Sequence, residues 1–173
     1  MRLIMNNKEK QRIKNYFLIF QGLDIQDVIE FHRYLLLPPH GAIEKDKPYQ
    51  DQEISTDLNL EHNKIEDITP LQNLTKLTHL YLSNNKIDDT SPLQNLTQLT
   101  HLHLFSNKIE DISPLQNLTQ LTKLYFYNTK IKDISPLQNL TQLTELYLRE
   151  NKIPRSQIAD LKKALPNCEI NYE

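Results

Sequence analysis

The sequence predicts an α/β repeat fold, in which short strands and tight turns stack side by side along one axis. Two observations lead to this prediction. The stretch Leu77–Gln98 recurs from Leu99, Leu121 and Leu143 with a period of 22 residues, and in weaker form from Ser55. Within each unit, leucines alternate with polar or aromatic residues over a segment of strand length. One such unit cannot bury its apolar face alone, so we expect residues 55–153 to share one stacked core that is covered at both ends.

The first half of each unit has the pattern of a short strand followed by a polar turn. Its members are leucines at the first, fourth and sixth places and an asparagine at the ninth, as in Leu77, Leu80, Leu82 and Asn85. Because leucines alternate with outward residues such as Tyr81, one strand face points into the stack. An asparagine amide both donates and accepts, so the ninth place predicts hydrogen bonds between neighbouring units. Thr129 replaces asparagine in one unit, where we expect a local weakness without a break.

The second half of each unit is a return segment, for example Asp111–Leu118, which reads Asp-Ile-Ser-Pro-Leu-Gln-Asn-Leu. Ser113 followed by Pro114 is a helix-start signal, with serine as the cap and proline in the first turn. The segment is too short for an α-helix, so we expect a 3₁₀ turn. Lysines at the tenth place run beside aspartates at the thirteenth. Rows of opposite charge that run side by side are typical of a solvated flank, to which we assign no function.

This repeat pattern, including the return Asp-Ile-(Ser/Thr)-Pro-Leu-x-Asn-Leu-Thr, resembles the 22-residue class of leucine-rich repeats. That class occurs in bacterial internalins and in a regulatory subunit of protein phosphatase 1. The resemblance covers roughly residues 55–173. It implies a curved, right-handed solenoid with a parallel sheet on its concave side and the 3₁₀ turns on its convex side. It also implies that the concave sheet binds a partner.

The N-terminal part of the chain has a different pattern. Residues 1–37 contain two apolar stripes at helical spacing, Ile13–Phe20 and Val28–Leu35, so we expect a helical segment that covers the first repeat. A dimerising element and a membrane-surface anchor are the alternatives. Residues 38–54 are rich in proline and charge, which is typical of a linker.

The last residues, 154–173, are expected to form a C-terminal cap. Ile158, Leu161 and Leu165 lie at helical spacing, and Ser156 is in position to cap that helix. An extended segment, Cys168–Tyr172, follows. A helix and a closing strand resemble the C-terminal caps of this repeat class.

Composition narrows the compartment and the classes of partner. The net charge of −2 gives no overall case for binding nucleic acid or an acidic membrane surface. The single cysteine, Cys168, suits a reducing compartment, and no segment approaches the roughly 20 apolar residues of a membrane span. We therefore predict a cytoplasmic protein, with a secreted effector that lacks a cleaved signal peptide as the alternative.

The repeat also predicts which side chains lie together, because neighbouring strands of a parallel sheet are about 4.8 Å apart. Equivalent places of successive units then form columns on the concave face. The third-place column contains Asp57, His79, His101, Lys123 and Glu145. The fifth-place column contains Asn59, Tyr81, His103, Tyr125 and Tyr147, and the seventh-place column contains Glu61, Ser83, Phe105, Tyr127 and Arg149.

These columns gather aromatic rings with polar edges, which is typical of protein interfaces. The alternative is that tyrosine favours strands and stacks on its neighbours. We expect the rings to face outward and to anchor a partner protein. The predicted partner-binding residues are His79, Tyr81, His101, His103, Phe105, Lys123, Tyr125, Tyr127, Glu145, Tyr147 and Arg149.

The histidines raise the question of a metal site. His79, His101 and His103 lie on adjacent predicted strands and could hold zinc, but no carboxylate or cysteine clearly completes the site. The alternative is a polar patch whose charge changes near neutral pH. We predict no metal and no cofactor.

The function predicted from the sequence is a non-enzymatic scaffold for protein–protein interaction, with a regulatory role. The chain has no nucleophile elbow, phosphate loop or metalloprotease histidine pair, and we expect no small-molecule substrate. One alternative is a host-directed bacterial effector or adhesin, by analogy with internalins. Another is a nucleic-acid-associated protein that uses the basic N-terminus.

Overall fold

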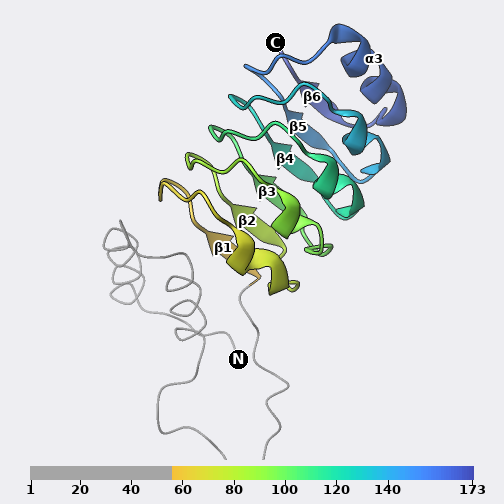
Figure 1. The fold of residues 1–173 in the computed structure, drawn as a ribbon. Coiled ribbons are helices and arrows are strands. Elements are labelled where there is room, and N and C mark those ends of the chain that lie inside the picture. Colours follow the sequence, from red (N-terminus) through yellow and green to blue (C-terminus); the bar gives the residue numbers. More distant parts are fainter. Residues whose placement is uncertain (1–55) are drawn as a thin grey trace, which may run out of the picture.

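The computed structural model describes residues 56–173, which form one stack of short strands (Figure 1). Six strands make a single parallel sheet in sequence order. They are β1 (Asp57–Asn59), β2 (His79–Tyr81), β3 (His101–His103), β4 (Lys123–Tyr125), β5 (Glu145–Tyr147) and β6 (Glu169–Asn171). The predicted N-terminal helical segment and the linker lie outside the described residues.

Short 3₁₀ helices occupy the side of the coil opposite the sheet (Figure 1). They are η1 (Thr69–Asn73), η2 (Ser91–Leu93), η3 (Ser113–Asn117) and η4 (Ser135–Asn139). The helix α3 (Arg155–Ala164) and the strand β6 close the C-terminal end. The prediction of a solenoid with a concave parallel sheet and convex 3₁₀ turns is thus confirmed, and so is the C-terminal helix and strand.

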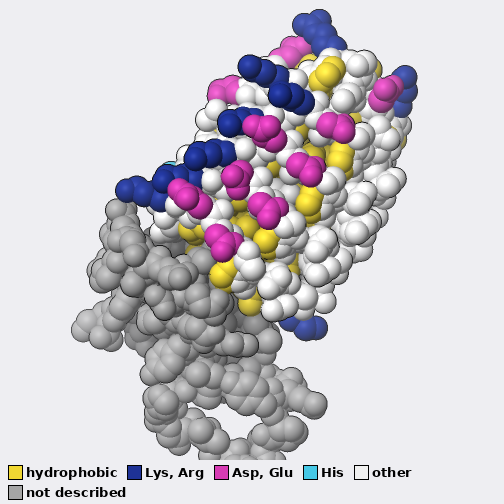
Figure 2. Space-filling view, in the orientation of Figure 1, with side chains coloured by type: hydrophobic (Ala, Val, Ile, Leu, Met, Phe, Trp, Pro, Cys, Tyr) yellow, Lys and Arg dark blue, Asp and Glu magenta, His cyan; other side chains and the backbone are white. Residues whose placement is uncertain are grey.

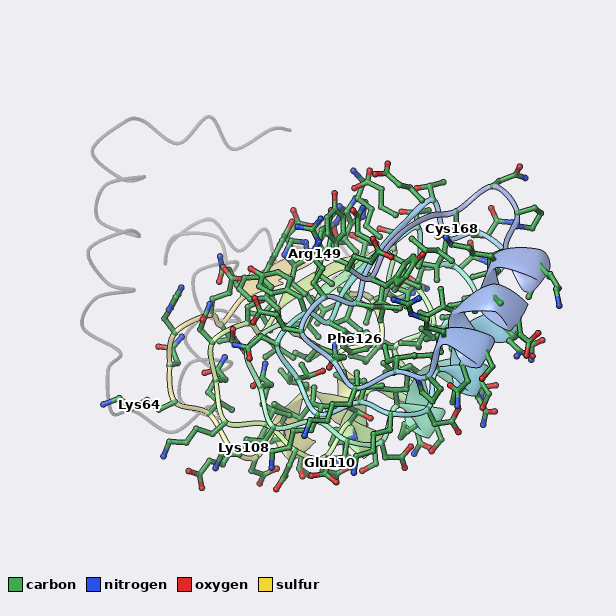
Figure 3. All side chains as sticks on the ribbon, turned by 90° about the horizontal axis from the view of Figure 1, so that it is seen from above. Lys64, Lys108, Glu110, Phe126, Arg149 and Cys168 are labelled. Atoms are coloured by element: carbon green, nitrogen blue, oxygen red, sulfur yellow. The ribbon has the colours of Figure 1, made fainter. Side chains whose placement is uncertain are left out.

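The core is a continuous column of leucine and isoleucine side chains, almost all of them without exposure to solvent. Phe126, which replaces leucine at a sixth place, lies inside the coil (Figure 3). Thr90 replaces isoleucine on the return side and is also buried, where its hydroxyl donates to the Asp111 carbonyl at 3.1 Å. The threonine therefore keeps its polar group satisfied inside an apolar column.

The prediction that serine caps the return segment is wrong. The N–H of Ser113 donates to Asp111 Oδ1 at 2.8 Å, and the Ser113 hydroxyl donates to Asp111 Oδ2 at 2.9 Å. The N-cap position belongs to Ile112, which makes no side-chain cap bond. An ionised carboxylate two residues upstream reaches the same N–H and is a stronger acceptor than a hydroxyl. Asp67, Asp89 and Asp133 accept the equivalent N–H in the other units.

The serine cap predicted for the C-terminal helix is also wrong. α3 begins at Arg155, with Pro154 in extended conformation at the N-cap, and Ser156 lies within the first turn. Proline fits the start of a helix because it needs no partner for an N–H. The helix buries Ile158 and Leu161 against the last repeat.

Two lysines of the tenth-place row pair with glutamates rather than with the aspartates beside them. Lys86 Nζ lies 2.8 Å from Glu66 Oε1, and Lys130 Nζ lies 3.5 Å from Glu110 Oε1. The aspartates are occupied by the backbone bonds described above. Figure 2 shows lysine and arginine side chains along one edge of the molecule, with rows of acidic side chains beside them. Figure 3 shows Lys108 and Glu110 pointing away from the coil at this edge.

Two polar ladders hold successive units in register. At the second place, each threonine hydroxyl lies within 3.3 Å of the carbonyl of the threonine one unit earlier, from Thr78 to Thr144. At the ninth place, Asn85 Nδ2 donates to the carbonyls of Leu60 and Leu82, and Asn85 Oδ1 accepts from the N–H of Ile65. Asn107 and Asn151 make the same carbonyl bond to the unit before them, as the asparagine pattern predicts, whereas Thr129 does not.

The residue before each ninth place adopts the left-handed backbone conformation. In successive units this eighth-place residue is His62, Asn84, Ser106, Asn128 and Glu150, with φ between 53° and 61°. Asparagine tolerates this conformation well, whereas in glutamate the close contact between Cβ and the backbone destabilises it. The turn after each strand thus has the same geometry in every unit, whatever residue occupies it.

Candidate functional site

The parallel register brings the predicted columns together on the concave face. His79 pairs with His101, Tyr81 with His103, and Tyr125 with Tyr147 across adjacent strands. The inward residues between them, such as Leu102 and Leu124, are fully buried. The eleven predicted binding residues therefore share one surface, because strand alternation leaves them no other face.

Rings of the fifth-place column form one continuous row, hereafter the central ring row. Tyr81 and His103 meet edge to face with their centroids 4.7 Å apart. His103 and Tyr125 are 4.2 Å apart, and Tyr125 and Tyr147 stack at 4.8 Å with 15° between their planes. The row spans four strands, β2 to β5, without a gap.

A stacked pair lies on each side of the central ring row. His79 and His101 stack at 4.3 Å and 24° in the third-place column. Phe105 and Tyr127 stack at 4.3 Å and 10° in the seventh-place column. His103 lies 6.4 Å from Phe105, so the central row also contacts one of the flanking pairs.

The rings are half-buried rather than fully outward, because each ring covers part of its neighbour. Near-parallel stacking hides the ring faces and leaves edges and polar tips toward the concave side. Ser83, expected on this surface, is fully buried, and its hydroxyl has no hydrogen-bond partner among residues 56–173. Arg149 is exposed at the C-terminal end of its column.

Lys123 and Glu145 form a fixed ion pair on the same surface. Lys123 Nζ lies 2.6 Å from Glu145 Oε1, and the Tyr125 hydroxyl donates to Glu145 Oε2 at 2.9 Å. The hydrogen bond from Lys123, followed by that from Tyr125, lowers the pKa of the Glu145 carboxyl. Burial, with the Glu145 hydrogen bond as a second cause, raises the pKa of Tyr125 to about 12. These two charges are therefore held by each other and by a tyrosine of the central ring row.

The histidines lie in a partly desolvated setting. Burial lowers the pKa of His103 and, with the charges of His79 and Lys123 as smaller causes, the pKa of His101. Both imidazoles are therefore neutral at neutral pH. Within residues 56–173, no group of three or more histidine, cysteine or acidic side chains could hold a metal ion.

Sequence reasoning missed the polar contacts that orient these rings. His79 Nδ1 lies 2.9 Å from Asp57 Oδ1, and Tyr125 bonds to Glu145 from the neighbouring strand. Both contacts follow from sequence spacing: Asp57 and His79 are 22 residues apart in the third-place column, and Tyr125 and Glu145 are 20 residues apart in the fifth- and third-place columns. Only side-chain geometry shows that those spacings are used.

The C-terminal end carries the lone cysteine. Cys168 is partly buried against the core, and burial raises its pKa to about 11. Its thiol is therefore protonated at neutral pH and a poor nucleophile. Within the described part of the chain, no helix has the length and apolar character needed to cross a lipid bilayer.

Comparison with known proteins finds a family match across nearly all of the described residues. The family profile described as "Leucine Rich repeats (2 copies)" matches residues 56–95, 75–117, 97–138 and 119–163. No curated protein sequence matches the chain.

Three solved structures of bacterial proteins are similar to the chain. Internalin C2 of Listeria monocytogenes is 39% identical with a TM-score of 0.62, over 68% of this chain and 51% of that protein. An internalin (inlF) of the same species is 39% identical with a TM-score of 0.60, over 65% of this chain and 35% of that one. An LRR protein of Leptospira interrogans is 30% identical with a TM-score of 0.61, over 66% of this chain and 30% of its own. The chain thus spans from about a third to about half of these proteins.

Proposed function

This chain belongs to the leucine-rich repeat family, and on that premise we propose that it is a scaffold that binds a partner protein on its concave sheet. The observation that carries the proposal is the central ring row with its two flanking pairs. Stacked rings restrain one another before binding, so little side-chain freedom is lost when a partner covers them. Large aromatic side chains at the centre of an interface supply most of its binding free energy.

The proposed contact centres on Tyr125, Tyr127 and Tyr147, with His103 and Phe105 toward the N-terminal side. Lys123 and Glu145, two of the three charged residues predicted to bind the partner, are already paired, so they suit specificity and association rate more than affinity. Arg149 is exposed and is the cation best able to reach a partner at the C-terminal end. The proposed role is regulatory and non-enzymatic, and the proposed location is the cytoplasm.

The test is capture of partners by the immobilised full-length protein from extracts, analysed by mass spectrometry. Tyr127→Ala and Tyr147→Ala should each weaken retention of the specific partner about thirtyfold, corresponding to roughly 2 kcal/mol at a central aromatic position. Gln116→Ala and Gln138→Ala are matched controls, because both glutamines are exposed on the convex η3 and η4. Retention that survives both tyrosine changes but falls in a convex variant would exclude the concave sheet.

A second candidate is a bacterial protein directed at a host, of internalin type. The 39% identity to two Listeria internalins favours it. The same capture experiment separates the candidates, because a host-directed protein should retain its partner from a eukaryotic host extract and not from a bacterial one. The nucleic-acid alternative depends on the basic N-terminus, which lies outside the described residues, and stays a prediction.

A further inference from the structure

The contact with Asp57 determines which ring nitrogen of His79 carries a proton. The Nδ1 atom lies 2.9 Å from Asp57 Oδ1, and a carboxylate oxygen can only accept. Nδ1 therefore carries a proton. In the neutral ring the second nitrogen, Nε2, is then a bare hydrogen-bond acceptor.

The threonine ladder likewise places the proton of His101 on Nδ1. The Thr100 hydroxyl lies 3.0 Å from the Thr78 carbonyl oxygen and 2.9 Å from His101 Nδ1. Thr122 and Thr144 make the same carbonyl bond although no histidine follows them, so this bond is a property of the repeat. The single hydroxyl proton of Thr100 thus serves the carbonyl, and His101 Nδ1 donates to the hydroxyl oxygen. His101 Nε2 is then also an acceptor.

Stacking places these two acceptors side by side. The His79 and His101 rings are nearly parallel with centroids 4.3 Å apart, and both hold their Nδ1 atoms against the threonine ladder. Neither Nε2 atom receives a hydrogen bond from any of residues 56–173. The pair forms one double acceptor at the flank of the central ring row.

The described side chains around this double acceptor supply mainly hydrogen-bond acceptors, and the lysine among them is paired. The groups that face His101 are His79, Asp57, Lys123 and Glu145, and the charge of Lys123 is matched by Glu145 at 2.6 Å. Glu61 acts on His103 from the neighbouring columns. The third, fifth and seventh places of the units that contain β1, β2 and β3 include no lysine or arginine. Among the described residues, these places of the N-terminal half of the concave face therefore supply acceptors and no lysine or arginine.

We propose that the partner inserts an arginine side chain whose guanidinium donates hydrogen bonds to the Nε2 atoms of both His79 and His101. A guanidinium is planar, carries five N–H donors and bridges paired acceptors, which an ammonium on a flexible stem does less well. This inference rests on the proposed function, because it names the chemistry of a partner at the same concave surface.

Binding of this kind is lost in acid. Protonation turns Nε2 into a donor, so it can no longer accept a hydrogen bond from the guanidinium. It also gives the imidazole a positive charge, which repels the guanidinium. Burial already keeps the pKa of His101 below its ordinary value of 6.5, so the acceptor form persists down to mildly acidic pH. Affinity is therefore present above that pKa and falls as the pH drops through it.

The test uses a capped hexa-arginine peptide as the probe and the full-length chain as the receptor, with calorimetry at neutral pH and at about pH 5. Hexa-arginine should bind at neutral pH and lose about tenfold in affinity at the acidic pH. The double variant His79→Phe with His101→Phe keeps two stacking rings but has no Nε2, so it should bind about tenfold more weakly and show no pH dependence. Glu110→Gln is the matched control, since it removes an acid at the lysine edge and should change nothing.

A second readout does not depend on affinity. The imidazole ¹⁵N spectrum should show Nδ1-protonated tautomers for both rings in the free protein, and the Nε2 signals should move on addition of hexa-arginine. The proposal is overturned if the double variant binds as the wild type does, if hexa-glutamate binds more tightly than hexa-arginine, or if hexa-arginine does not bind. Any of these results would leave the tyrosine test of the proposed function standing.

Discussion

The Thr129 hydroxyl lies 2.7 Å from Asn151 Oδ1 and 3.0 Å from the Phe126 carbonyl, at the place where the other units have an asparagine amide. Asn107 at the same place reaches the carbonyls of both its own unit and the previous one. Thr129 makes no such bond to the unit before it. Thr129→Asn should therefore add the missing bond to the Leu104 carbonyl, and should raise the free energy of unfolding by about 1 kcal/mol.

Thermal unfolding measures this change, and a gain of that size corresponds to about 4 °C in midpoint. Thr129→Ala is the paired control, since it removes the hydroxyl contacts and should lower the midpoint. A Thr129→Asn variant that is no more stable than wild type would show that the threonine site cannot accommodate the ladder.

Glu150 predicts a second stabilising change. Its φ is 57°, in the left-handed region where glutamate is disfavoured and glycine is not. Glu150→Gly should therefore raise the free energy of unfolding by about 0.5–1 kcal/mol, after the loss of chain entropy of glycine is subtracted. Denaturant titration provides the measurement. Glu150→Ala keeps the Cβ and should have little effect, so an equal gain in both variants would point to charge rather than backbone strain.

The turn aspartates predict a loss of stability in acid. Hydrogen bonds from Ser135 lower the pKa of Asp133, and those from Thr69 lower the pKa of Asp67, below the ordinary value of 3.8. A carboxyl with a lowered folded-state pKa stabilises the fold above the unfolded-state value. That stabilisation is lost as the pH falls below 3.8 and through the lower pKa of the folded state.

Asp133→Asn isolates this effect, because the amide oxygen still accepts from the Ser135 N–H but does not titrate. Thermal midpoints measured from pH 7 to about pH 2 should fall less steeply in the variant than in the wild type. Parallel curves for the two proteins would assign the acid sensitivity to other groups.

Deletion of residues 1–50 should lower the thermal midpoint and promote association. The reason is the predicted helical segment, whose removal would uncover the first repeat and expose apolar surface. Light scattering and calorimetry of the shortened chain provide the measurement. A truncated protein that stays monomeric with an unchanged midpoint would identify the segment as a separate module.

The fold was largely predictable because the repeat period fixes where backbone atoms lie. A 22-residue period places Leu80 beside Leu102 and His79 beside His101, as the sheet register confirms. The same argument predicts which residues share the concave face, with Ser83 as an exception because it is fully buried. It needed only strand alternation, which does not depend on side-chain conformation.

Side-chain contacts are less predictable, since the repeat period does not determine which of several acceptors within reach receives a hydrogen bond. Ser113 was expected to cap its turn, but Asp111 accepts the backbone bond. Lys86 was expected beside aspartate, but it pairs with Glu66. The aromatic rings were expected to face water, but stacking over 4.2–4.8 Å makes them partly cover one another. In each case the alternative side-chain contacts differ in free energy by only about 1 kcal/mol, which a repeat period does not resolve.

The threonine ladder that holds the strands in register also limits which insertions and deletions the fold tolerates. The protein segments Gln94–Thr100 and Gln116–Thr122 are identical, so duplication or loss between them inserts or removes one whole 22-residue unit. Such an event lengthens or shortens the sheet by one strand, about 4.8 Å, and recreates the threonine–carbonyl bond at the new junction. An insertion of any other length breaks the ladder and shifts a strand out of alignment. The molecule can therefore evolve the reach of its concave surface in whole-unit steps, without a compensating change in its core.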